Sequence, residues 1–196
     1  MKYIDVFITI HATSQWNELG LTQGHCDSEL SKAGRNMSLL LAKRPDLSEV
    51  RAIYTSDLKR SHQTAAPLSE RISIPIVTSP LLREGNWAHH HRDSEYPPLP
   101  FDGPFEDKET LTKRAVRSMT DIAKSQQCSP ILVIAHATFV RCFLYEMFPN
   151  RALEYQGIRT AINHLRHSDG VWQLMTLNDD AHLRDSFQEN TSLDSG

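Results

Sequence analysis

The chain has 196 residues, of which 39% are hydrophobic, and a formal net charge of −3. This length is enough for one domain that buries about 70% of the surface of its unfolded chain. Basic residues are scattered along the sequence, which argues against nucleic acid or a membrane surface as a partner and favours a small-molecule ligand. We expect a single domain over residues 1–183 and a polar, disordered tail over 184–196.

The cysteines and the N-terminus indicate a cellular location. The three cysteines are odd in number and have no Cys-x-x-Cys spacing, which is typical of free thiols in a reducing compartment. The sequence shows no signal-type N-terminal segment and no apolar run of about 18 residues. These features predict a cytoplasmic protein that does not span a membrane.

The first part of the chain alternates between strand and helix patterns. The apolar run Ile4–Ile10 predicts a strand. Ser31 is a suitable N-cap for a helix that extends to about Lys43, and Pro45 would end that helix. Residues 50–54 then predict a second strand.

A second helix follows that strand. Ser56 or Asp57 can cap it, and Pro67 should perturb its later part. Arg60 would then lie near the N-terminus of the helix, where anions are favoured. Residues 74–77 predict a short third strand.

The middle of the chain contains a segment without periodicity. Residues 85–107 are rich in proline, glycine, histidine and acidic groups, which predicts a long loop or lid. An amphipathic helix over 109–127, a strand over 131–135 and a helix over 139–148 follow it.

The last predicted element is a hairpin of residues 158–165 and 171–177. Because strands and helices alternate before it, we predict an α/β three-layer sandwich, with a mainly parallel sheet and helices on both faces.

Two histidines stand where apolar strands end. His11 follows the run Ile4–Ile10, and His136 follows residues 131–135. Ligands of open α/β sheets bind at the carboxyl ends of the strands, so the two imidazoles can meet over one substrate. This placement predicts covalent or acid–base chemistry by histidine.

Six segments around these histidines resemble, in order, the motifs of the histidine phosphatase superfamily, which includes the phosphoglycerate mutases. The matching segments are residues 11–17, 23–34, 54–65, 81–84, 133–141 and 177–183. Three positions depart from the pattern. The arginine before the first histidine of the family is Ile10 here, and the glycines after the two histidines are Ala12 and Ala137. One of the four cationic groups of the phosphate pocket is therefore missing.

The resemblance implies a role for each matching residue. His11 would attack phosphorus and hold a phosphohistidine, Arg60 would bind phosphate oxygens, His136 would stabilise the transferring group, and Glu84 would protonate the leaving alkoxide. It implies no metal and no cofactor. Residues expected to line the substrate side are Ile10, Ala12, Asn17, Gln23, Gly24 and Ala137.

Simpler interpretations of three of these residues stay open. Arg60 can be a solvated helix arginine, and Asn17 can cap a turn. Glu95 and Glu106 are alternatives to Glu84 as the acid.

The run His89–His91 suggests either a zinc site, which its spacing does not favour, or a substitute for the cation missing at Ile10. Arg83 is a second candidate for that substitution.

The sequence leaves three functional hypotheses, which differ in what the missing cation means for activity. The first is a phosphomonoesterase-type hydrolase of a small metabolite that is weak or has an altered substrate, because one lost donor costs roughly 10² to 10³ in rate. The second is a catalytically silent binding protein of the same fold. The third is an enzyme that uses the histidines and the glutamate for acid–base chemistry without phosphoryl transfer.

Overall fold

The computed structural model describes residues 3–86 and 105–184, in which a six-stranded sheet has the order β3-β2-β4-β1-β5-β6. The strands are β1 Ile4–Ile10, β2 Ala52–Thr55, β3 Ile76–Thr78, β4 Ile131–Ala135, β5 Ile162–Ser168 and β6 Val171–Asp179. The first four run parallel, and β5 and β6 form an antiparallel hairpin beside β1. The predicted mainly parallel α/β sheet is confirmed.

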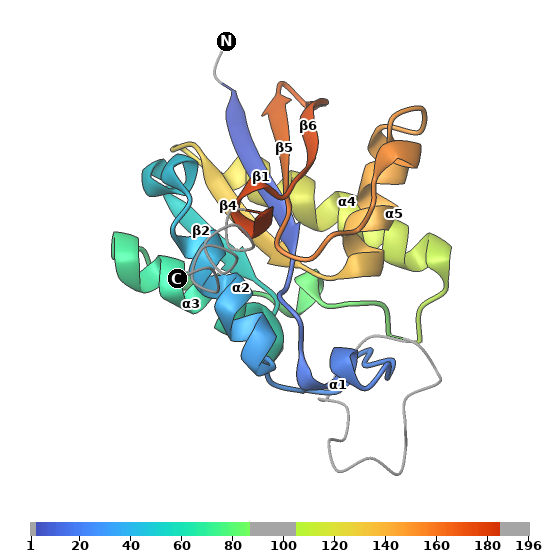
Figure 1. Cartoon of the computed structure of the whole chain (residues 1–196). Helices are drawn as coiled ribbons and strands as arrows, with labels where there is room; N and C mark the ends of the chain where they lie inside the picture. The colour runs from blue at the N-terminus through green and yellow to red at the C-terminus, as the bar shows by residue number, and fades with distance from the viewer. Residues whose placement is uncertain (1–2, 87–104, 185–196) are drawn as a thin grey trace.

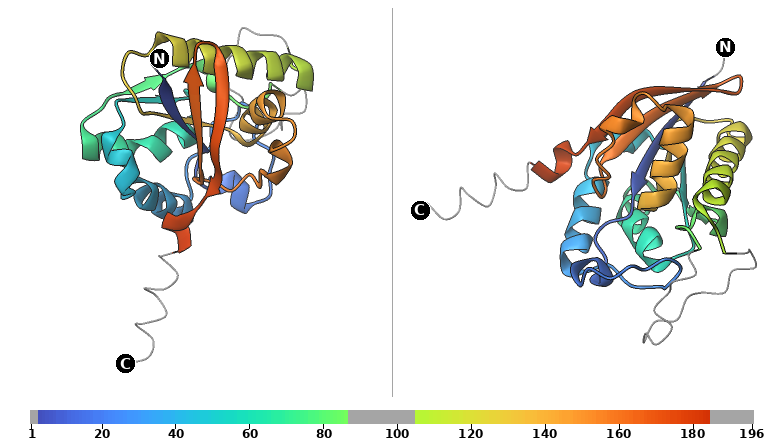
Figure 2. Two further views of the ribbon diagram at one scale, coloured as in Figure 1. Left: turned by 90° about the horizontal axis from the view of Figure 1, so that it is seen from above. Right: turned by 90° about the vertical axis from the view of Figure 1, so that its right-hand side faces the viewer.

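Helices cover both faces of this sheet (Figures 1 and 2). The α-helices are α1 Gln15–Glu18, α2 Lys32–Ala42, α3 Lys59–Ile72, α4 Lys108–Ser125 and α5 Ala137–Met147, and the 3-10 helices are η1 Pro45–Glu49, η2 Pro80–Leu82 and η3 Ala152–Glu154. Side chains of α4 and α5 pack in one core cluster, and those of α2 and α3 pack in the other. No helix in the described residues is long and apolar enough to cross a membrane.

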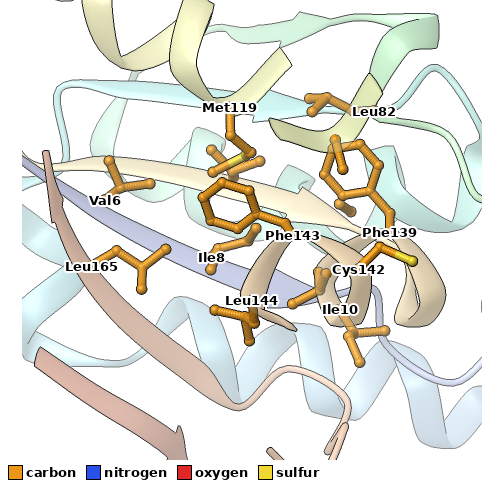
Figure 3. Close-up of a cluster of buried hydrophobic side chains, with 14 of the residues drawn as sticks. Val6, Ile8, Ile10, Leu82, Met119, Phe139, Cys142, Phe143, Leu144 and Leu165 are labelled. Atoms are coloured by element: carbon orange, nitrogen blue, oxygen red, sulfur yellow. The ribbon is translucent and has the colours of Figure 1, made fainter. Parts of the chain in front are cut away.

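The central strands β1 and β4 are buried on both faces, which explains why β4 is apolar throughout and β1 is apolar except for Asp5 and Thr9. In β4, Val133 and Ala135 pack toward α4 and α5, whereas Leu132 and Ile134 pack toward α2 and α3. Ile10, at the end of β1, belongs to the same cluster as Ile8 (Figure 3). The carboxyl end of β1 is therefore anchored by core packing.

The helix boundaries agree with the sequence at α2 and differ at α3. Ser31 caps α2 by accepting from the N–H of Gly34, as predicted. The predicted cap of α3 was wrong, because Leu58 occupies that position, while the Asp57 carboxylate binds Arg83. The predicted disruption by Pro67 is also absent, because packing of α3 on the sheet holds the helix together across the proline.

Two further boundaries needed correction. Strand β5 begins at Ile162 rather than at residue 158, because Thr160 has a positive φ of 60° that interrupts extended structure. At the end of the predicted loop, Asp107 caps α4 by accepting from the N–H of Thr110. Residues 87–104 of the predicted lid and 185–196 of the predicted tail lie outside the described residues.

Gly34 marks a close approach between α2 and the loop that follows His11. A Cβ atom at this position would lie 1.8 Å from the backbone oxygen of Thr13. Alanine favours helices more than glycine does. Gly34→Ala should nevertheless destabilise the protein by about 2 kcal/mol or more, because the loop must shift to make room for the methyl group. Chemical unfolding measures this loss. Asn36→Ala, at an exposed position of α2, is the matched control, and equal stability of the two variants would contradict the close-packing argument.

Candidate active site

The parallel pairing of β1 and β4 brings the two histidines together. Ile10 pairs with Ala135, and the N–H of His11 donates to Ala135 O at 3.1 Å. The ring centroids of His11 and His136 lie 5.1 Å apart, and both side chains are buried. A phosphoryl-sized ligand at this end of the sheet can therefore contact both imidazoles.

The hydrogen bonds of His11 determine which nitrogen is available for chemistry. Nδ1 lies 2.7 Å from Ala12 O, and because a carbonyl oxygen only accepts, Nδ1 carries the proton. In the neutral ring, Nε2 then has the free lone pair, and Nη1 of Arg159 donates to it at 3.4 Å. His11 is thus oriented with Nε2 as its nucleophilic atom.

His136 is oriented by a hydrogen bond to Ser56, which follows β2. Its Nε2 lies 2.7 Å from Ser56 Oγ, and among the described residues its buried Nδ1 has no hydrogen-bond partner. Burial, followed by the charge of Arg60, lowers the pKa of both His11 and His136 well below its ordinary value. Both rings are therefore neutral at physiological pH, which is the state that a nucleophile needs.

Arg60 lies at the N-terminal end of α3, and its side chain is buried, with 1% exposure. Its Nη1 donates to Cys26 O and its Nη2 to Gly24 O, both at 2.7 Å. Burial lowers the pKa of Arg60 to about 10, which still leaves it charged at neutral pH. The solvated-arginine interpretation is therefore wrong.

Glu84 lies at the N-terminus of α5, the helix that follows His136. Its carboxylate accepts from the N–H groups of Thr138 at 3.1 Å and Phe139 at 3.2 Å. The position of the carboxylate is thus fixed by the helix that His136 begins. Its role as the acid stays a prediction.

Three of the residues that were predicted to line the substrate side form hydrogen bonds within or to the loop after β1. Asn17 forms a capping box with Ser14, as the simpler interpretation expected. Gln23 accepts from the hydroxyls of Ser14 and Ser28, and Gly24 accepts from Arg60. A substrate contact of these residues stays a prediction.

The three positions that the resemblance expects to be an arginine and two glycines lie next to the histidines in the chain. Ile10 is 1% exposed and packs in the core cluster that also contains Cys142 (Figure 3). Ala12 is buried, and its N–H donates to Thr64 Oγ1 at 3.0 Å. Ala137 is half-buried at the start of α5.

The sequence also offered alternatives for the missing cation and for the acid. Arg83 forms a bidentate pair with Asp57, and Glu106 forms one with Arg114. His89–His91 and Glu95 lie outside the described residues. Within residues 3–86 and 105–184, no group of three histidine, cysteine or acidic side chains is placed to hold a metal ion.

Sequence reasoning missed Arg159 and Ser56. Arg159 approaches His11 because residues 158–160 lie beside the end of β1, where Thr160 N–H donates to Ile10 O at 3.0 Å. The sequence contains two signals for Ser56, its position after a strand and its place in the matching segment 54–65, but none that places Arg159 next to His11.

His182, near the C-terminal end of the described residues, forms a hydrogen bond with Thr160, the residue next to Arg159. Arg44 Nη1 donates to His182 Nδ1 at 3.3 Å, so the neutral ring donates from Nε2 to Thr160 Oγ1 at 3.2 Å. Burial, followed by the charge of Arg44, lowers the pKa of His182 to about 4, against the opposing effect of nearby carboxylates. The opposing carboxylates are Asp46, Asp179 and Asp180.

This buried imidazole predicts a pH-dependent stability. Between the unfolded pKa of 6.5 and the folded value of about 4, only the unfolded chain binds the proton at His182. The contribution of His182 to stability is therefore complete above pH 6.5 and is lost as the pH falls toward 4. Urea unfolding of the wild type and His182→Gln at several pH values measures it. The stability difference should shrink on acidification, and a constant difference would contradict this assignment.

Comparison with known proteins agrees with the fold. The profile of the Histidine phosphatase superfamily (branch 1) matches residues 6–180. The chain is 24% identical to Phosphoglycerate mutase-like protein 4 of Arabidopsis thaliana, covering 95% of this chain and 90% of the relative. It is 23% identical to the Metal-independent phosphoserine phosphatase of the same plant, covering 91% and 83%.

A solved structure has the same fold. Phosphoserine phosphatase from Entamoeba histolytica, in complex with 3-phosphoglyceric acid, matches with a TM-score of 0.73 and 20% identity, over 93% of this chain and all of that one. With the family profile matched over nearly the whole sheet and two histidines facing each other at its carboxyl edge, this chain belongs to branch 1 of the histidine phosphatase superfamily.

Proposed function

We propose that the protein is a metal-independent phosphomonoesterase of small phosphorylated metabolites and that it works through a phosphohistidine at His11. The orientation of His11 carries this proposal. Its Nδ1–H is bound by Ala12 O, its Nε2 is in contact with Arg159, and its ring centroid lies 5.1 Å from that of His136. A neutral imidazole held in this tautomer is an activated nucleophile that needs no metal.

The reaction has two steps. In the first, Nε2 of His11 attacks phosphorus, the bond to the substrate oxygen breaks, and Glu84 gives a proton to the leaving alkoxide. In the second, water attacks phosphorus while Glu84 takes a proton from the water, the bond between phosphorus and Nε2 of His11 breaks, and inorganic phosphate leaves. His136 and Arg60 stabilise the charge on the transferring group in both steps.

Relatives support the class of substrate. One relative is named a metal-independent phosphoserine phosphatase, and one solved structure holds 3-phosphoglyceric acid. Both compounds are small phosphate monoesters that carry a carboxylate. We therefore place the substrate among phosphorylated small acids.

Trapping the phosphoenzyme tests the proposal. The protein is mixed with ³²P-labelled phosphoserine and denatured in base, because the N–P bond of phosphohistidine survives base and breaks in acid. The label should be retained in base, lost in acid, and found on the peptide that contains His11. His62→Ala, at an exposed position of α3, should be labelled like the wild type.

A catalytically silent protein gives a different result. Folded wild type that neither becomes labelled nor releases phosphate from phosphoserine, 3-phosphoglycerate or an aryl phosphate would refute the proposed function. Binding of these compounds without turnover would then favour the binding protein.

A further inference from the structure

Within residues 3–86 and 105–184, one buried and one half-buried arginine form no ion pair with a carboxylate. The other buried or half-buried arginines each pair with an acidic residue: Arg44 with Asp46 and Asp179, Arg83 with Asp57, Arg114 with Glu106, and Arg166 with Asp5. In the described part of the chain, Arg60 and Arg159 form no such ion pair, and both lie at His11. The Glu84 carboxylate acts on both guanidinium groups electrostatically but forms no ion pair with either. Because a desolvated cation is costly without a counter-charge in contact with it, this arrangement indicates a site for an anion.

Arg159 is placed against the nucleophilic atom itself. Its Nη1 lies 3.4 Å from Nε2 of His11 and 3.5 Å from His11 O. By contrast, both Nη atoms of Arg60 donate to main-chain carbonyls. Among the described residues, the guanidinium of Arg159 is therefore the cationic group in contact with the atom that would receive phosphorus.

The backbone around Arg159 explains why the guanidinium reaches this place. Arg159 is the bridge partner of Ile10, and the next residue, Thr160, is held by a hydrogen bond to Ile10 O. The cation thus enters from the chain segment alongside the end of β1, while the side chain of Ile10 fills the core. An apolar side chain at position 10 therefore does not prevent a cation from reaching His11, because the cation comes from a different chain segment.

We propose that Arg159 binds the phosphoryl group that is transferred to His11 and so supplies a cation that position 10 does not. This inference rests on the proposed function for the transfer step, but the anion-binding role stands without turnover. In the free protein, the N–H of Arg159 points at the lone pair of Nε2. When a phosphate ester binds, its oxygens become the acceptors, and charge-assisted hydrogen bonds to them are stronger than the bond to a neutral imidazole.

A kinetic series tests this role. Arg159→Ala should lower kcat/KM by about 10² to 10³, the effect of one transition-state donor, and Arg159→Lys should lower it less. Added guanidinium should restore part of the activity of Arg159→Ala. The control is Arg151→Ala, an exposed position whose partner is Glu154. Equal kcat/KM of Arg159→Ala and the control would overturn the proposal.

The pH profile separates a charge effect from a structural one. Because the charge of Arg159 helps to lower the pKa of His11, its removal should move the acidic limb of kcat/KM to higher pH. A variant that is merely less well folded would lose amplitude at every pH and would keep the limb in place. An unmoved limb, together with no rescue by guanidinium, would also overturn the proposal.

Binding of inorganic phosphate distinguishes failure of this inference from failure of the proposed function. Calorimetry of phosphate with the wild type, Arg159→Ala and Arg151→Ala needs no catalysis. Weaker binding by Arg159→Ala alone supports the role of Arg159, even if no phosphatase activity is found. Unchanged phosphate affinity in folded Arg159→Ala refutes it, even if the wild type is an active phosphatase.

Discussion

Substitution of His11 is expected to abolish phosphatase turnover. Without an imidazole at this position no phosphoenzyme forms, and kcat for a phosphomonoester should fall by about 10⁴-fold or more, because the other groups of the site act only together with the nucleophile. Phosphate release from p-nitrophenyl phosphate and phosphoserine measures the loss. Retention of more than a tenth of the wild-type kcat would exclude a covalent role of His11.

His11→Asn is the sharper variant. Its side-chain N–H group can keep the hydrogen bond that Nδ1 of His11 makes to Ala12 O, so the loop after β1 stays supported while the nucleophile is removed. We expect His11→Ala and His11→Asn to be equally inactive, with His11→Asn closer to the wild type in thermal stability. Activity of His11→Asn alone would show that the bond to Ala12, and not nucleophilic attack, is the function of His11.

Glu84→Gln should separate substrates by their leaving groups. If Glu84 is the acid, kcat/KM for phosphoserine should fall by about 10² to 10⁴, while p-nitrophenyl phosphate should lose much less, because its leaving group needs no proton. The carboxylate also accepts from Thr138 and Phe139, and weakening those contacts lowers activity on both substrates alike. The diagnostic quantity is therefore the ratio of the two kcat/KM values.

Glu106→Gln is the matched control for this ratio. Glu106 was an alternative acid in the sequence, and the structure pairs it with Arg114. Its substitution is expected to lower stability by breaking a buried ion pair and to leave the substrate ratio unchanged. Equal losses on both substrates in Glu84→Gln would rule out Glu84 as the acid.

Much of the framework was predictable because strand and helix patterns are local. The apolar runs at Ile4–Ile10 and 131–135 are strands, and Ser31 caps α2. Placing His11 beside His136 needed only the rule that parallel strands end at one edge of the sheet. The local pattern was less reliable where a polar side chain had a distant partner, as Asp57 has in Arg83.

The sequence by itself determined the α/β alternation, the two histidines at strand ends and the absence of an arginine at position 10. Only the tertiary structure decided which cation stands at the nucleophile, because Arg159 is 148 residues from His11 and reaches it where the segment before β5 lies beside the end of β1. Periodicity reports which face of an element is buried, but not which elements become neighbours. The burial of Arg60 was also decided by the tertiary structure. Its guanidinium is held in the interior by hydrogen bonds to Gly24 O and Cys26 O, which no local sequence pattern predicts.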